Sequence, residues 1–523
     1  MKRWGGKPVQ QGFIRLIALA VGLALASAHP ATAQKPGDTL RLAAVQPIQT
    51  LSYYFDPTPD TVFESNGVYD GLVSYNVKTG AIEPLLAKSW QRIDPTTLEF
   101  ELRDDVKWQD GTPLTAADVV YTLNWLSDPK TLIRFQLNWA WIAKVEQTGP
   151  YRLRVTAKEP TPFDLTRFAY VTTIFPAHQA EALPDKESIG HHPIGSGPYR
   201  VKLIDDFKGI QLERNEGYAA HGNAAKPATN VERILIQPMP EDGTRIAHLL
   251  AGDLDLIQQV PFEQAETLAQ DPRFAMTIVP GSSFMYAAFD ARGRSGNKAV
   301  LDERVRRALI MAIDRPSLIK LLAGDAKLEL PEAMCWRAQA GCDYTAALPA
   351  YDPAGAAKLL AEAGYAQGFD IEITTFVGTP STIAEAVAGQ WYKLGIRSKI
   401  DRLAVVSYRK KLQAGQIQVM IAAWPAGNIP DVSATVDSFF AAGPTDYSGD
   451  ETLHQLARQS DTTMDPAARK AIGRTMFDRA TEKVFFVPIS PYPSVLIHTK
   501  HVAVTPTDRF TPMGYGMTDI QWQ

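Results

Sequence analysis

The chain is 523 residues long, and its 45% apolar and 21% charged residues are typical of a folded globular protein rather than a disordered one. This length allows two or three domains around a large core. The formal net charge is −4, which argues against nucleic acid or an anionic membrane as the main partner.

The first 33 residues predict a cleaved export signal. Basic residues precede an apolar run at 16–26, and Ala-Thr-Ala at 31–33 supplies the small residues that signal peptidase requires. The apolar run is too short to span a bilayer comfortably. No cysteine follows the predicted cleavage site directly, so we expect no lipid anchor there. We expect the mature chain to begin at Gln34 as an exported protein. It then has 49 basic against 57 acidic residues, a net charge of about −8.

Short alternating segments dominate the mature N-terminal half. Three of them, "LEFELRDDVKW" (98–108), "YRLRVTAKE" (151–159) and "VERILIQPM" (231–239), place apolar and polar residues in turn. Clusters of Gly, Pro and Asp separate them. This pattern predicts strands joined by turns.

The pattern changes near residue 300. "LDERVRRALIMAID" (301–314) predicts a helix with Asp302 as its N-cap, and "YDPAGAAKLLAEAGY" (351–365) predicts a second helix. The segments that follow alternate between strand and helix: strand 369–376, helix 381–395, strand 396–403, helix 408–415 and strand 418–424. Such a series builds a sheet with helices on its faces, and ligands bind where the strands of such a sheet end. Trp424 lies at one of these ends.

Cys335 and Cys342 are the two cysteines of the chain. Export makes a disulfide between them the favoured interpretation. A redox pair usually has two intervening residues rather than six, and a metal site would need more ligands nearby.

The sequence carries none of the common catalytic or metal-binding motifs. "PIGSGPY" (193–199) lacks the spacing of a serine nucleophile, and neither a phosphate-binding loop nor His-Glu-x-x-His is present. The His191-His192 pair points to opposite sides if it is extended. We therefore predict that the protein is not an enzyme and holds neither a metal nor a cofactor.

Aromatic residues at loop entries are better candidates for ligand contact. Tyr53 and Tyr54 follow the first strand-like segment, and Trp424 precedes the polar loop "PAGNIPD". Packing in the core is the alternative for each of them.

Several segments together resemble the solute-binding proteins of ABC importers that bind dipeptides, oligopeptides or nickel. They are "VFESNGVYDGLVSYN", "IEPLLAKSWQRIDPTTLEFELRDDVKWQDGTPLTAADVVYTL", "PIGSGPYRV", "LLAGDLDLIQQVP", "DERVRRALIMAIDRPSLI", "AGYAQGFDIEI" and "VMIAAWPAGNIPD". They occur in the same order along nearly the whole mature chain. The resemblance implies a two-lobed α/β periplasmic-binding-protein fold of the Venus flytrap type, closing on its ligand by a hinge.

The resemblance also implies the domain boundaries. The first lobe would span 34–286, with an extra subdomain at about 75–195, the second lobe would span 287–491, and 492–523 would return to the first lobe. The protein would be a periplasmic monomer that delivers a small solute to a membrane permease and its ATPase.

Two departures from the resemblance concern the solute. Dipeptide- and oligopeptide-binding relatives carry an aspartate after the tryptophan for the peptide amino group, where this chain has Gly427. Dipeptide binders also carry an arginine for the carboxylate, where Thr379 stands nearest. An unpaired buried terminus costs several kcal/mol, so a free dipeptide is expected to bind poorly.

A sugar, an opine-like conjugate, an aromatic compound or a blocked peptide fits better. The predicted binding residues are Trp424, Gly427, Asn428, Asp431, Tyr53, Tyr54, Phe376 and Thr379. Three alternatives stay open: a carrier of haem or metal chelates with the same fold, an exported hydrolase, and a ligand sensor.

Overall fold

The computed structural model describes residues 38–46, 50–134, 136–169, 172–205, 207–219, 226–425, 429–511 and 513–523. The predicted export signal, Gly427 and Asn428 lie outside these residues. Within the described part of the chain, no helix is both long enough and apolar enough to cross a membrane.

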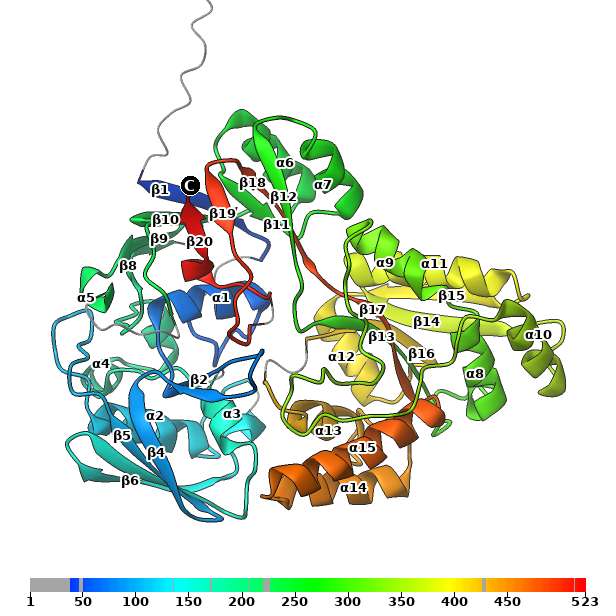
Figure 1. Ribbon diagram of the computed structural model, residues 1–523, viewed down its shortest axis with the longest axis horizontal. Helices are drawn as coiled ribbons and strands as arrows, with labels where there is room; N and C mark the ends of the chain where they lie inside the picture. Colours follow the sequence, from blue (N-terminus) through cyan, green and yellow to red (C-terminus); the bar gives the residue numbers. More distant parts are fainter. Residues whose placement is uncertain are drawn as a thin grey trace, which may run out of the picture. The chain divides into compact units, whose positions relative to one another are not determined.

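A seven-stranded mixed sheet is built mainly from the N-terminal half (Figure 1). Its strands, in spatial order, are β12 (Phe274–Val279), β18 (Ser494–Thr499), β11 (Leu256–Gln258), β1 (Thr39–Ala44), β10 (Arg233–Pro238), β9 (Gly209–Arg214) and β8 (Tyr199–Asp205). The C-terminal strand β18 lies between β12 and β11. The end of the chain therefore returns to the sheet that its beginning starts.

A five-stranded sheet is built from residues 284–491. Its order is β15 (Arg397–Leu403), β14 (Asp370–Phe376), β16 (Val419–Trp424), β13 (Phe284–Phe289) and β17 (Phe486–Pro491). β14 runs parallel to β15 and β16, whereas β13 is antiparallel to β16 and β17. The predicted alternation of strand and helix between 369 and 424 is confirmed.

Side chains of β13 alternate between the two faces of this sheet, as an extended strand requires. Met285, Ala287 and Phe289 pack with one apolar cluster, and Phe284 and Tyr286 pack with another. The first face is covered by α8 (Glu303–Met311), α9 (Arg315–Ala323), α10 (Pro353–Glu362) and α11 (Thr379–Tyr392). The second is covered by α12 (Val405–Gln413), α13 (Ser433–Phe439), α14 (Glu451–Thr462) and α15 (Pro466–Glu482).

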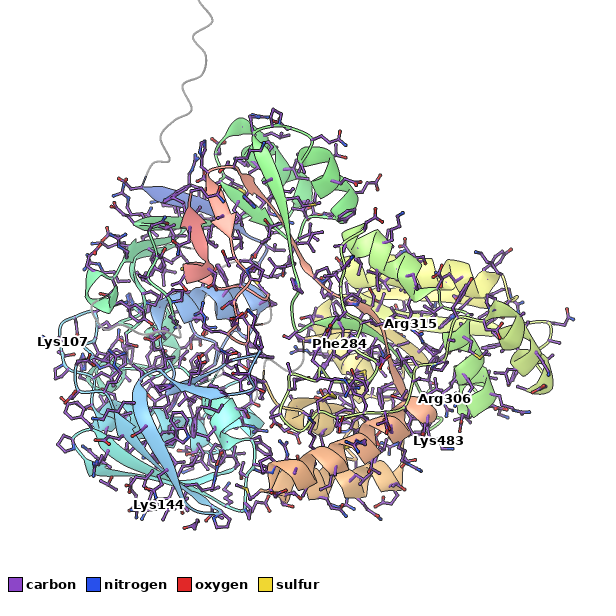
Figure 2. All side chains as sticks on the ribbon, in the orientation of Figure 1. Lys107, Lys144, Phe284, Arg306, Arg315 and Lys483 are labelled. Atoms are coloured by element: carbon purple, nitrogen blue, oxygen red, sulfur yellow. A yellow bond between two sulfur atoms is a disulfide. The ribbon has the colours of Figure 1, made fainter. Side chains whose placement is uncertain are left out.

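Local signals place several of these helices. Asp302 caps α8 as predicted, and Asp352 caps α10; each accepts a hydrogen bond from a backbone N–H of the first turn. Arg306 of α8 then donates to the carbonyl of Lys483, which fastens α8 to the end of α15 (Figure 2). The capping residues set where the helices begin, and such long-range hydrogen bonds set where they dock.

The remaining elements belong to the stretches before 280 and after 494. A four-stranded antiparallel sheet contains β4 (Ala87–Asp94), β5 (Thr97–Leu102), β7 (Arg152–Ala157) and β6 (Ile142–Gly149), and the short pairs are β2 (Val73–Tyr75) with β3 (Ile82–Pro84) and β19 (Val502–Val504) with β20 (Ile520–Trp522). The helices are α1 (Pro59–Val68), α2 (Ala116–Ser127), α3 (Asp164–Phe168), α4 (Ala177–Ala182), α5 (Glu216–Ala219), α6 (Asp242–Ala251) and α7 (Phe262–Leu268).

The chain crosses between the two large sheets twice. The first crossing joins β12 to β13, and the second joins β17 to β18. Both crossings are only a few residues long. The domain boundaries predicted from the sequence stay a prediction.

Candidate functional site

One edge of the five-stranded sheet gathers the ends of three parallel strands. β14 ends at Phe376, β15 at Leu403 and β16 at Trp424. At the same edge β13 starts and β17 ends, because Phe284 pairs with both Trp424 and Pro491. Ligands of such sheets bind beyond the carboxyl ends of the strands. The candidate site therefore lies where the two crossings leave this sheet.

Trp424 is half-buried, and residues near it in the chain hold its ring in place. Its indole N–H donates to the Thr435 hydroxyl at 3.0 Å. The ring also packs edge-to-face on Phe439, with centroids 4.9 Å apart. These contacts fix the orientation of the ring, and the part that stays exposed is available to a solute.

Phe376 and Thr379 lie at the end of β14 and the start of α11. Phe376 is half-buried and packs edge-to-face on Tyr408, with centroids 5.5 Å apart. The Thr379 side chain is hydrogen-bonded to the side chain of Tyr492, a residue of the second crossing, and burial raises the pKa of that tyrosine. Thr379 thus connects the sheet edge to the crossing.

Exposed valines at this edge were not singled out from the sequence. Val377, Val405 and Val406 are 60%, 45% and 67% exposed; Val377 directly follows β14, and Val405 and Val406 are the first two residues of α12. These exposed fractions exclude burial of the three side chains in the core. The three valines give this edge of the sheet an exposed apolar surface. The sequence pattern predicted only the buried strand residues beside it.

Asp431 is fully buried, which the sequence did not indicate. Its carboxylate accepts two hydrogen bonds from the Arg469 guanidinium, at 2.6 and 2.7 Å, and one from the backbone N–H of Ser433 at 2.7 Å. This carboxylate therefore supports the loop after β16. Its predicted hydrogen bond to a solute stays a prediction, and would require the pair with Arg469 to open.

Tyr53 and Tyr54 are buried among other aromatic rings. The Tyr54 hydroxyl donates to the Thr173 carbonyl at 2.6 Å, and its ring packs edge-to-face on Trp125, Trp139 and Phe175. Tyr53 packs on Tyr54 and Trp139. These are the contacts of core residues, so the predicted closing of both tyrosines on a solute stays a prediction.

Several contacts join residues before 280 to residues of the 284–491 stretch. Tyr75 donates its hydroxyl proton to the Ala338 carbonyl at 2.6 Å, and Arg167 of α3 pairs with Asp437 of α13 at 3.4 Å. Ile429, which precedes α13, is buried in the apolar cluster that contains the core of the four-stranded sheet. The loop after β16 therefore packs on the stretch before 280.

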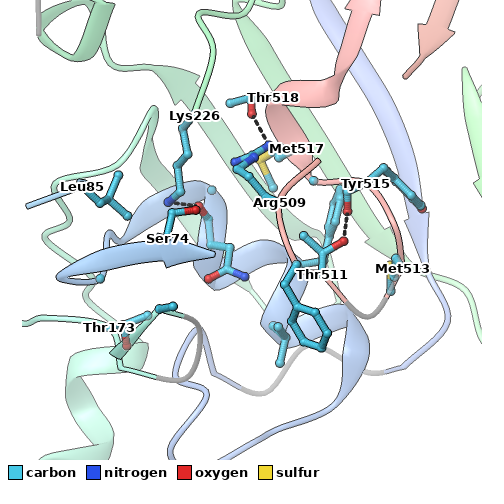
Figure 3. Close-up of a pocket in the computed structure, with 18 of the residues that line it drawn as sticks. Ser74, Leu85, Thr173, Lys226, Arg509, Thr511, Met513, Tyr515, Met517 and Thr518 are labelled. Atoms are coloured by element: carbon cyan, nitrogen blue, oxygen red, sulfur yellow. Dashed lines mark hydrogen bonds between the residues drawn. The ribbon is translucent and has the colours of Figure 1, made fainter. Parts of the chain in front are cut away.

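A cavity of about 60 Å³ lies between α1, β2 and a loop of which residues 509–511 and 513–518 are described, called the 509–518 loop below (Figure 3). Its apolar wall consists of Val62, Phe63, Leu85, Phe510, Met513 and Met517. Its polar lining includes Asn66, Ser74, Lys226 and Arg509. The sequence offers no local signal for this cavity, because its lining runs from Pro59 to Thr518, which lie 459 positions apart.

The structure joins Cys335 and Cys342 in a disulfide. The described residues contain no group of three or more His, Cys, Asp or Glu side chains placed to hold a metal.

Comparisons with known proteins agree on one family. The model of "Bacterial extracellular solute-binding proteins, family 5 Middle" matches residues 81–447. Heme-binding protein A of Haemophilus influenzae is 28% identical over 444 residues, which cover 79% of this chain and 77% of that protein. Glutathione-binding protein GsiB of Escherichia coli K12 is 24% identical over 504 residues, 92% of this chain and 94% of that protein.

A solved structure shows the same fold. The ABC transporter substrate-binding protein CtaP of Listeria monocytogenes superposes with a TM-score of 0.80 at 20% identity, over 92% of this chain and 99% of that one. This likeness confirms the two-lobed α/β fold predicted from the sequence.

Proposed function

The chain belongs to family 5 of the bacterial extracellular solute-binding proteins, and from this premise we propose that it captures an organic solute without free peptide termini. It is a solute-binding component of an ABC importer, which works with a membrane permease and an ATPase. Members of this family are binding components of transporters and not enzymes, so the predicted lack of catalysis is confirmed. Family 5 proteins are periplasmic; cleavage of an export signal after residue 33, and a monomeric state, are part of the proposal.

The ion pair between Asp431 and Arg469 is the observation that carries the solute class. A peptide amino group needs a carboxylate, yet the carboxylate nearest Trp424 in sequence is 0% exposed and bonded to a guanidinium. Recruiting it would break both of its hydrogen bonds with the buried Arg469 guanidinium, which would keep its bond to the Ser460 carbonyl, at a cost of several kcal/mol. Together with the valines at the sheet edge, this favours a neutral or apolar group of the solute at this place.

Closure of the lobes is the proposed mechanism. Lobes at 34–286 with 492–523 and at 287–491 would rotate about the two short crossings. The contact between Arg167 and Asp437 and the burial of Ile429 support closing along this line. A solute that binds the closed form better than the open form shifts the population towards closure, and no chemistry is required.

A thermal-shift screen tests the proposal. The panel holds free dipeptides, blocked dipeptide amides, opines, oligosaccharides and aromatic acids, since a compound that binds only the folded protein raises its Tm. The largest shift is expected from a compound outside the free dipeptides. A free dipeptide that gives the largest shift would contradict the proposed solute class.

A second candidate is a carrier of haem or metal chelates. It is favoured by the 28% identity to heme-binding protein A. Titration with haemin and with nickel–histidine, followed by absorbance and by Tm, separates it from a carrier of metal-free organic solutes.

A further inference from the structure

We propose that the cavity between α1, β2 and the 509–518 loop binds a short uncharged aliphatic group of the solute. This inference rests on the proposed function and deepens it. A water-sized atom needs about 10–15 Å³ of such space, so a cavity of about 60 Å³ holds roughly four to six non-hydrogen atoms. A branched aliphatic side chain or a short amide chain has this size.

The two cations of the cavity are already neutralised. The Lys226 ammonium donates to the carbonyls of Asn66 and Tyr69, at 2.7 and 2.8 Å, and to the Asp70 carboxylate at 2.6 Å. These three bonds use all three protons of the ammonium group. Arg509 pairs with Asp519 at 2.8 Å in the same way. The cavity therefore offers no net charge, and a charged group would enter it without compensation.

Two polar groups of the lining are left for a ligand. Among the described residues, neither the Asn66 side-chain amide nor the Ser74 hydroxyl makes a hydrogen bond. Ser74 is buried, and Figure 3 shows it at the wall of the cavity with Lys226 and Arg509. The remaining wall is apolar. An aliphatic group that carries a hydroxyl or an amide would satisfy both residues, whereas a purely apolar group would leave them unpaired.

The residues that line the cavity all come from the stretches before 280 and after 494, and one of them is next to a contact with the 284–491 stretch. Ser74 precedes Tyr75, whose hydroxyl donates to the Ala338 carbonyl of the 284–491 stretch. The 509–518 loop, which forms one wall of the cavity, also contacts residues at both crossings. The Ser494 hydroxyl donates to the Met513 carbonyl at 3.0 Å, and Gly514, with φ of 75°, leaves no room for a side chain against the Pro280 carbonyl. A group that fills the cavity thus contacts a wall attached to the hinge.

Thiol labelling of a Ser74→Cys variant tests the class of the ligand without knowledge of the solute. The two native cysteines are bonded to each other, so the new thiol is the only one in the chain. The probes are 2-hydroxyethyl methanethiosulfonate, which is neutral, and its trimethylammonioethyl and sulfonatoethyl analogues, which are charged. A Thr79→Cys variant in an exposed turn is the control, since it corrects for the intrinsic rate of each reagent.

We expect the ratio of neutral to charged labelling rates to be at least tenfold higher in Ser74→Cys than in Thr79→Cys. Equal ratios in the two variants, or faster labelling of Ser74→Cys by a charged reagent, would overturn the assignment. Circular dichroism of both variants before labelling shows that they fold.

The link to the solute is tested by the screening panel. Labelled Ser74→Cys is expected to lose the Tm shift that the best compound gives to the wild type, while labelled Thr79→Cys keeps it. If labelled Ser74→Cys keeps the shift, the cavity is not part of the solute site, although the proposed function stands. If no compound shifts the wild type, the proposed solute class falls, and the proposed role of the cavity in binding that solute falls with it.

Discussion

Asp431 and Arg469 form a buried ion pair with two hydrogen bonds, across 38 positions of the sequence. The pair joins the loop after β16 to α15, and the backbone N–H of Ser433 adds a third bond to the carboxylate. Because Trp424 lies at the start of the same loop, the pair helps to fix the candidate site without a contact to the solute. The pair therefore couples the position of this loop, and of the candidate site beside it, to the stability of the second lobe.

Substitution of Asp431 by Asn should destabilise the protein strongly. Removal of one charge from a buried pair leaves the other uncompensated, which costs about 3–5 kcal/mol. Arg458→Gln is the matched control, because Arg458 is exposed and its pair with Glu451 is on the surface; its effect should stay within about 0.5 kcal/mol. Urea unfolding measures both changes. A loss below about 1 kcal/mol for Asp431→Asn would show that the pair contributes little.

The stability of the protein should fall with rising pH because of Asp461. Burial, together with the charge of Asp437, raises the pKa of Asp461 to about 8, while Arg469 acts in the opposite direction. An unfolded aspartate has a pKa of about 3.9. Between about pH 4 and pH 8 the folded state therefore holds a proton that the unfolded chain has released, and its stability decreases across this window.

An Asp461→Asn variant removes this titration. Its Tm relative to the wild type should rise steadily between pH 5 and pH 8. Asp325→Asn is the control, because it changes an exposed carboxylate. Asp465→Asn is unsuitable, because Asp465 caps α15. A Tm difference that is the same at every pH would contradict the raised pKa.

Local patterns predicted the order of elements well. Helix α8 begins after Asp302, and strand β16 ends at Trp424, as expected, because capping and alternation depend on neighbouring residues. The partners of Asp431 and Tyr54 could not be predicted in this way. Arg469 lies 38 positions from Asp431, and Thr173 lies 119 positions from Tyr54, so only the folded chain brings them together.

The disulfide between Cys335 and Cys342 should contribute moderately to stability. Closing a loop with a sequence separation of 7 gains about 2–3 kcal/mol in the chain-entropy model. A variant with both cysteines changed to Ser should therefore unfold at a lower urea concentration, and reduced wild type should match it. Both cysteine side chains lie in the apolar cluster under α13–α15, where the hydroxyls of the two serines would be buried. A variant with both cysteines changed to Ala therefore controls for the effect of burying these hydroxyls. Equal stability of reduced and oxidised wild type would contradict the expected contribution.

Removal of the Trp424 ring should weaken solute binding more than it weakens folding. The exposed part of the ring is held by Thr435 and Phe439, so a solute gains contact area without paying for ordering of the side chain. Trp424→Ala should lower the affinity for the best panel compound roughly tenfold, which corresponds to about 1.4 kcal/mol.

Trp424→Phe separates the two roles of the ring. It keeps an aromatic ring against Phe439 but loses the hydrogen bond to Thr435, so it should retain most of the affinity while its Tm falls slightly. Isothermal titration with the same compound gives the affinities, and unfolding curves give the stabilities. If Trp424→Ala binds as tightly as the wild type, the ring belongs to the packing of the second lobe alone, and the solute must sit farther along the sheet edge, towards Phe376.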